Sequence, residues 1–330
     1  MTKKVKTQKV KFKKTAPTFT KESIRKFFLG SKERMGFIKT TLAYLILISI
    51  GFIFLYPIFK MVSMSFMSLS DLVSSSVSWI PTKLHTANYS AAFKALDFKK
   101  SLINSIILSG VPTIIQVCMA AYVGYGFARF NFTGKKLMMG LLLFSFILPP
   151  QVITTPTYVQ YSQLGLTGTI WAFVIPAILG QGIKAPIFIL ITMTFYKQVP
   201  QSLIEAAHID GAGYIKSFFK IAIPSATGAL VVVLLFSFVW YWNETYLTSL
   251  YVTKGKNSPW RTLVMGLSNF DQYYNESNPS VSSSGTTTAN INEAYRMAGT
   301  VLTILPLLIL YAFMQKFFVE SIDRAGITGE

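Results

Sequence analysis

EAAHIDGAGYIKSFFKIAIP, residues 205–224, is a short polar stretch between two long apolar segments. Its spacing is EAA-x3-G-x9-I-x-I-P, which runs from Glu205 to Pro224. A glutamate followed by two alanines favours a short helix with small side chains on its surface. Gly211 permits the positive φ with which the chain turns into a second helix. The stretch therefore predicts a solvated helix–turn–helix that joins two apolar spans.

Composition places the chain in a membrane. Hydrophobic residues make up 52% of it and charged residues only 13%, against about 25% charged in an average soluble domain. A bilayer requires about 20 consecutive apolar residues per helix. Six charge-free runs approach or exceed that length: Thr40–Phe59, Leu102–Phe127, Leu137–Tyr161, Gly168–Ile183, Ile221–Asn243 and Met297–Gln315. We predict an all-α polytopic membrane protein with six transmembrane helices.

Prolines are expected to bend several of these spans. The fourth run continues past Lys184, so its helix is predicted over about Thr169–Tyr196 with one ionisable residue inside. Pro149, Pro150, Pro176 and Pro186 interrupt the apolar pattern of the third and fourth spans. Each removes a backbone donor and breaks or kinks a helix.

The net charge of +18 is concentrated at the N-terminus. Residues 1–39 carry 13 lysines and arginines but only two glutamates. Attraction to anionic lipid or RNA is one interpretation of this arm, but a cytoplasmic flank of the first span is the better one. Membrane lipid is therefore an expected partner and nucleic acid is not. We predict a basic arm over residues 1–39, a transmembrane domain over 40–318 and a tail over 319–330. Alternation of six spans places both termini and the loop 197–224 in the cytoplasm, and the loop 244–296 outside.

No constellation of catalytic residues is visible. The chain lacks a G-x-x-x-x-G-K-[ST] loop, a G-x-S-x-G elbow and an H-E-x-x-H pair. Cys118 is the single cysteine, and His85 and His208 are isolated in sequence, so no metal site is predicted. We expect no enzymatic activity, no ATP hydrolysis and no cofactor bound by this chain.

Several further stretches resemble one family. They are TANY (86–89), AYVGYGFARF (121–130), LPPQVITTP (148–156), FVWYWN (238–243) and QKFFV (315–319). Together they resemble the second, maltose-G-type permease subunit of carbohydrate ABC importers, over about residues 38–330. The stretch 205–224 is similar to the cytoplasmic loop that couples such permeases to their ATPases. The tail ESIDRAGITGE departs from the family pattern, and the basic arm and the segment Asp271–Asn292, interpreted as a flexible or lid-like insertion, are longer than usual.

The resemblance implies a type I ABC importer permease fold in the bacterial cytoplasmic membrane. It also implies partners: a second homologous permease, a cytoplasmic ATPase dimer that binds ATP and Mg, and an extracytoplasmic sugar-binding protein. ATP-driven closure of the ATPases would then drive alternating access to an oligosaccharide or related carbohydrate.

Two groups of site residues follow from the resemblance and the chemistry. Coupling to the ATPase is assigned to a helix over Glu205–Asp210 and to the turn after it, with Glu205, Ala206, Ala207, Asp210 and Gly211 as contact residues. Candidates for the translocation path are Gln181, Lys184, Trp240, Trp242 and Asn243. Tryptophan faces stack on sugar rings, although an aromatic belt at the membrane interface is the simpler interpretation. Lys184 hints at an anionic group on the substrate, and Arg129 is expected to reach the cytoplasmic interface.

Other functions remain open at this point. An ABC permease for an amino acid, a peptide or a metal is the nearest alternative. An ion-coupled secondary transporter is less favoured, because the predicted spans contain no carboxylate. An intramembrane enzyme is opposed by the lack of a catalytic pair.

Overall fold

The computed structural model describes residues 36–74, 76, 79–253, 258–277 and 293–327, and every regular element in these ranges is helical. This agrees with the predicted all-α class. The chain divides into two compact units, Met1–Lys60 and Met61–Glu330. The basic arm lies almost wholly outside the described residues, so its predicted role is untested.

The first unit is described over most of helix α2, Phe37–Ser65, which continues into the second unit. Its large apolar side chains are exposed along its whole length, as Leu47, Ile53 and Phe54 illustrate. A helix of 29 residues with such a surface is long enough to cross a bilayer with its side chains in lipid.

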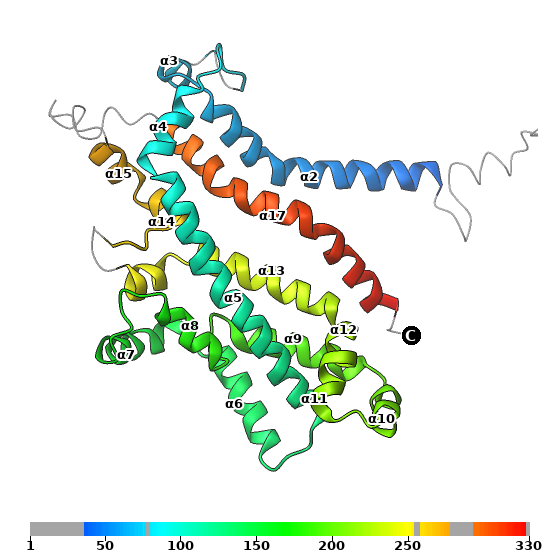
Figure 1. Ribbon diagram of the computed structural model, residues 1–330. Coiled ribbons are helices and arrows are strands. Elements are labelled where there is room, and N and C mark those ends of the chain that lie inside the picture. Colours follow the sequence, from blue (N-terminus) through cyan, green and yellow to red (C-terminus); the bar gives the residue numbers. More distant parts are fainter. Residues whose placement is uncertain (1–35, 75, 77–78, 254–257, 278–292, 328–330) are drawn as a thin grey trace, which may run out of the picture. The chain divides into compact units, whose positions relative to one another are not determined.

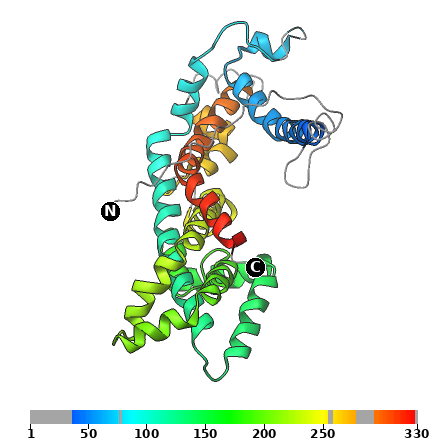
Figure 2. The same ribbon diagram turned by 90° about the vertical axis from the view of Figure 1, so that its right-hand side faces the viewer.

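The second unit is organised around the long helix α5, Phe98–Arg129 (Figure 1). Helices α9, Ala185–Gln198, and α13, Thr227–Asn243, pack along it. Both views show α5 running from the region of α4 to the region of α11 (Figure 2). The other helices of this unit are α3 (Leu69–Val73), α4 (Ala87–Ala95), α6 (Lys135–Ile147), α7 (Pro150–Gln163), α8 (Trp171–Ile178), α10 (Gln201–Ile209), α11 (Tyr214–Ser217), the π-helix η1 (Phe218–Ala222), α12 (Ile223–Ser225), the π-helix η2 (Thr248–Val252), α14 (Leu263–Ser268), α15 (Phe270–Ser277) and α17 (Glu293–Ile327).

Helices α5 and α9 approach closely at Gly124. A Cβ at this position would lie 2.2 Å from the Thr192 hydroxyl oxygen and 2.9 Å from the Met193 backbone nitrogen. The Thr192 hydroxyl donates to the Ala120 carbonyl across the interface at 2.7 Å. Small residues on α5 therefore permit contact between the backbones of the two helices, as is common for packed membrane helices.

The structure supports fewer straight spans than predicted. Among the described residues, three single helices are long and apolar enough to cross a membrane: Phe37–Ser65, Phe98–Arg129 and Glu293–Phe317. Two bent pairs also qualify when each is counted as one span, Lys135–Ile147 with Pro150–Gln163 at 98° and Tyr214–Ser225 with Thr227–Asn243 at 77°. The first bend falls at Leu148 and Pro149, because a residue before proline is driven out of the helical region. The predicted six spans are therefore not confirmed; three to five are supported.

The predicted fourth span is interrupted. Instead of one helix over Thr169–Tyr196, the chain forms α8 and α9 with a break between Ile178 and Ala185. Gly180 has φ +70° and Lys184 has φ +57° within the break. Both values lie in the left-handed region, where a right-handed helix cannot continue.

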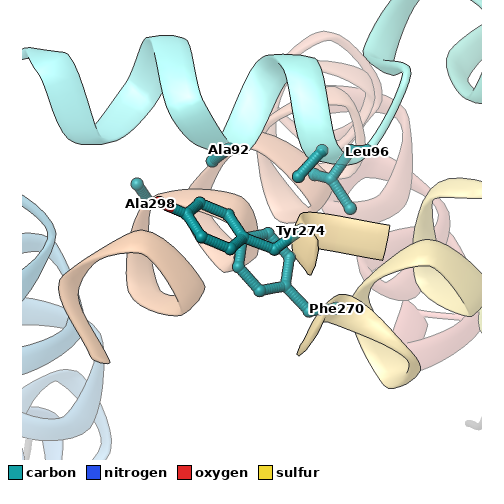
Figure 3. Close-up of a cluster of buried hydrophobic side chains, with 6 residues drawn as sticks. Ala92, Leu96, Phe270, Tyr274 and Ala298 are labelled. Carbon is teal, nitrogen blue, oxygen red and sulfur yellow. The ribbon is translucent and has the colours of Figure 1, made fainter. Parts of the chain in front are cut away.

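A separate cluster of buried side chains joins three helices from distant parts of the chain (Figure 3). Ala92 of α4 and its C-cap residue Leu96 pack against Phe270 and Tyr274 of α15 and Ala298 of α17. Phe270 and Tyr274 are four residues apart, so they share one face of α15.

Helix α15 differs from the prediction that the insertion Asp271–Asn292 is flexible. The residues at its start, Asp271–Ser277, were expected to be flexible, yet they are helical, and the Asp271 carboxylate pairs with the Arg296 guanidinium at 2.6 Å. Burial of Phe270 and Tyr274 stabilises α15 and explains why these residues are helical. Residues 278–292 of the same insertion lie outside the described part of the chain.

Asp71 ties helix α3 to the segment that follows it. Its carboxylate accepts the Thr82 hydroxyl at 2.7 Å and the Ser68 backbone N–H at 3.3 Å, within a capping box. These donors, Thr82 first, hold the pKa of Asp71 below its usual value despite the opposing effect of burial.

Candidate functional site

The stretch 205–224 forms the predicted helix–turn–helix. Helix α10 covers Gln201–Ile209, so it begins four residues before Glu205, and Asp210 is its C-cap residue. The Gly211 N–H donates to His208 at 3.1 Å and the Ala212 N–H to Ala207 at 2.8 Å. With Gly211 at φ +77°, this is the Schellman arrangement that ends a helix through glycine.

The assigned coupling residues form an open surface. Glu205, Ala206, Asp210 and Gly211 are exposed and Ala207 is half-buried. No heavy atom outside the local backbone lies within 4 Å of a Cβ built on Gly211. The structure thus places these five residues together on the outside of the turn, where another protein can reach them.

Several exposed apolar side chains in the segment 201–224 were missed from the sequence. Leu203, Ile209 and Ile215 are 50%, 87% and 75% exposed. They lie on the segment whose polar composition suggested a solvated loop. Apolar side chains grouped on a polar segment are typical of a surface that another protein covers.

Arg129 joins the end of α5 to the start of α10. Its guanidinium donates to the Tyr196 carbonyl at 2.5 Å, to the Val199 carbonyl, and to the Gln201 side-chain oxygen at 2.9 Å. The expected interface charge is therefore folded back onto the protein. A forked donor on one helix holds the end of α9 and the first residue of α10.

Aromatic rings support the same junction. Tyr125 of α5 lies 5.5 Å from Tyr196 and 5.0 Å from Phe218 between ring centroids. The His208 ring of α10 meets Tyr214 of α11 edge-on at 4.9 Å. The two arms of the turn, α10 and α11, are thus packed on one another, and η1 is packed on α5.

A second site forms where α8 and α9 separate. The Gln116 side chain donates to the Ile183 carbonyl at 2.8 Å and accepts from the Tyr241 hydroxyl at 2.9 Å. The same hydroxyl accepts the Ile183 N–H at 3.2 Å. A Cβ on Gly182 would lie 2.0 Å from Gln116 Oε1. Gln116 of α5 and Tyr241 of α13 therefore hold the backbone N–H and carbonyl of Ile183 in the break. The neighbouring position 182 has room only for glycine.

Lys184 follows directly and borders an open hollow of about 330 Å³. Its Nζ lies 5.1 Å from the centre of the Trp240 ring, a cation–π contact. The hollow is lined by Ile183, Lys184, Val239, Trp240, Asn243 and Glu244. A cation, an indole, an amide and a carboxylate thus line one space.

The structure gathers three of the five candidate path residues and separates two. Lys184, Trp240 and Asn243 share the hollow. Trp242 is 2% exposed and packs on Phe238 at 5.7 Å, so it belongs to the interior of the fold. Gln181 is exposed but does not line the hollow. Gln116 and Tyr241, which position the break, were missed because their partners are far away in sequence.

No metal centre is found in the described ranges, where no group of three or more His, Cys, Asp and Glu side chains could hold an ion. Cys118 lies exposed on α5.

Comparisons with known proteins identify relatives along most of the chain. The "Probable ABC transporter permease protein YurM" of Bacillus subtilis is 27% identical over 305 residues, covering 92% of this chain and 91% of its own length. The "Polygalacturonan/rhamnogalacturonan transport system permease protein YtcP" of the same species is 27% identical over 87% of this chain and 97% of its own. The "Maltodextrin transport system permease protein MalD" of Streptococcus pneumoniae is 26% identical, with 88% and 95% covered.

A solved structure has the same fold. A chain of "a bacterial ABC transporter involved in the import of the acidic polysaccharide alginate" matches with a TM-score of 0.70 at 20% identity, over 92% of this chain and all of the other. The predicted resemblance to carbohydrate ABC importer permeases is confirmed. Residues 116–324 match one family model, and this chain belongs to the family of binding-protein-dependent transport system inner membrane components.

Proposed function

We propose that this chain is the permease subunit of an ATP-driven importer for an oligosaccharide or related carbohydrate. Its relatives are named for polygalacturonan and maltodextrin transport, which supports a saccharide substrate. In this proposal both termini and the turn after α10 lie in the cytoplasm, and the segment 244–296 lies outside. A second homologous permease and an extracytoplasmic sugar-binding protein complete the path.

ATP and Mg are bound by a cytoplasmic ATPase dimer, and this chain contributes no catalytic residue. The observation that carries the proposal is helix α10 with its glycine cap, exposed at the end of α5 that carries Arg129. The open surface of Glu205, Ala206 and Gly211, with Ile209 beside it, suits a groove on an ATPase. Closure of the ATPases moves α10, and the Arg129 contacts pass the motion to α5.

The substrate path passes the hollow beside Trp240. Helices α8 and α9 both pack on α5. In this proposal they cross the membrane together as a broken span. Broken helices form substrate sites in many transporters, because the backbone groups freed at the break face the path. The indole of Trp240 offers a flat apolar face of the kind on which sugar rings stack.

Two matched glycine variants test the coupling. Gly211→Val and Gly165→Val both place a β-branched residue at a positive φ, +77° and +69°, with no neighbour within 4 Å of the added Cβ. Each costs on the order of 1–2 kcal/mol of backbone strain. Only Gly211 lies on the coupling surface, so Gly165→Val controls for strain. Glu205→Lys tests the surface by charge, with Lys83→Ala as its control.

The assay is ATP-dependent uptake of radiolabelled maltotriose and trigalacturonate by a deletion strain that carries each variant. We expect Gly211→Val and Glu205→Lys to abolish uptake while the chain still inserts, since insertion depends on span hydrophobicity and flanking charge. The controls should transport normally. Normal uptake by both coupling variants would remove the proposed role of this segment, and a wild-type chain that imports neither probe would remove the substrate class.

A further inference from the structure

We propose that Lys184 is the binding site for the carboxylate of an acidic saccharide, with Trp240 as the platform for its ring. The inference rests on the proposed function, because it concerns the substrate of the same path. It adds a chemical class, a uronate-bearing saccharide, and the atom that recognises it.

The depth of the site follows from α5. This helix has 32 residues, with Lys99 and Lys100 near one end and Arg129 at the other. Gln116 lies close to the middle of the charge-free stretch between them, and it is bonded to Ile183. Lys184 is therefore held at about mid-height of a spanning helix, where an ionisable side chain is costly and marks a pathway or a ligand site.

Lys184 has no anionic partner within this chain's described residues. The ion pairs found there join Arg261 to Asp97 and Arg296 to Asp271 and Glu293. The Lys184 ammonium lies 5.1 Å from the centre of the Trp240 ring, and a cation at an aromatic face remains available to a carboxylate. Lys184 is also exposed on this chain and borders the hollow.

The position of Lys184 is imposed by the fold. A lysine at φ +57° is disfavoured, and such a conformation persists only where the surroundings determine it. Here Gln116 and Tyr241 hold the preceding residue through both of its backbone groups. The strained backbone thus places the ammonium over the indole before a ligand arrives, which lowers the entropic cost of binding.

The carboxylate of Glu244 lines the same hollow and could repel an anion. However, it accepts the Leu247 N–H at 2.8 Å and so serves the turn that follows α13. The Asn243 amide donates to the Val239 carbonyl at 2.9 Å and leaves its oxygen free for a sugar hydroxyl. The hollow therefore combines a cation for a carboxylate, an aromatic face for a ring and an acceptor for hydroxyls.

The test compares one saccharide with and without its charge. Trigalacturonate and its fully methyl-esterified form share a skeleton, and uptake kinetics of both are measured in the deletion strain carrying wild type, Lys184→Met, Lys184→Arg or Lys94→Met. Lys94 is an exposed lysine of α4, remote from the hollow in sequence, and controls for loss of one charge.

We expect Lys184→Met to raise the KM for trigalacturonate on the order of ten-fold or more, because a charge-assisted contact is lost. The KM for the ester should not change, Lys184→Arg should restore most of the preference, and Lys94→Met should resemble wild type. The inference is overturned when the wild type shows no preference for the acid. It is also overturned when Lys184→Met raises the KM for both probes equally, which is the result expected if Lys184 pairs with a partner subunit. In either case the Gly211→Val result stands by itself, so the two proposals can fail separately.

Discussion

Replacing Arg129 should disconnect α10 from α5. The guanidinium donates to the carbonyls of Tyr196 and Val199 and to the side chain of Gln201. Hydrogen bonds from a charged donor contribute about 1.5–3 kcal/mol each when they are shielded from water. The contact with Gln201 is exposed and contributes little, so Arg129→Met removes about 3–6 kcal/mol as an upper bound. Arg129→Lys should keep one of the two carbonyl contacts and lose about half of that amount.

The assay is the ratio of ATP hydrolysed to solute imported by the purified transporter in proteoliposomes. A loss of about 3 kcal/mol shifts the engaged junction by more than a hundred-fold in its equilibrium constant, since about 1.4 kcal/mol is ten-fold. We expect the ratio to rise at least about ten-fold in Arg129→Met and less in Arg129→Lys. Amide hydrogen exchange in α10 should also quicken. An unchanged ratio in Arg129→Met, with all subunits still bound, would refute the role of this junction.

Three further changes test packing and pH. Gly182→Ala should loosen the break and lower thermal stability, because its Cβ would lie 2.0 Å from Gln116 Oε1; a melting temperature equal to wild type would contradict the close fit. Phe270→Ala should cost about 3–5 kcal/mol of unfolding free energy, as its ring is 1% exposed in the cluster of Figure 3, which denaturant unfolding of the detergent-solubilised chain can measure. Because the folded pKa of Asp71 lies below 3.8, its contribution is present above that pH and is lost as the pH falls through the folded value. Hydrogen exchange around Thr82 should therefore quicken in acid, and Asp71→Asn should show fast exchange with little pH dependence beyond the intrinsic rate.

Local chemistry made the turn after α10 predictable. Gly211 is the residue type that a left-handed helix end requires, and the spacing to Glu205 set the helix before it. The apolar runs likewise predicted α2, α5 and α17 as spans, since about 20 consecutive apolar residues are typical of a transmembrane helix. These features depend on neighbours in sequence.

The rest depends on partners far along the chain. The prolines predicted a bend in the fourth span, but the backbone at the break before Lys184 is held by Gln116 and Tyr241, which are 67 and 58 residues from Ile183. Exposure of Ile209 could not be predicted, because apolar character by itself suggests burial. The Arg129 contacts, 67 to 72 residues apart, were hidden for the same reason.

In the proposed mechanism, the break beside Lys184 affects how far a movement at α10 is transmitted. Ile183 is hydrogen-bonded through both of its backbone groups, and Thr192 of α9 is bonded to Ala120 of α5, so we expect α5, α9 and α13 to rotate together as one rigid group. Arg129 lies thirteen residues beyond Gln116 on α5, which corresponds to about 20 Å along the helix. Each degree of tilt about the Arg129 end therefore displaces the hollow by about 0.3 Å, and a tilt of about 10° displaces it by roughly 3–4 Å. Opening and closing of the hollow can thus be driven by rotation of α5, α9 and α13 as one rigid group. No turn of these helices needs to unfold.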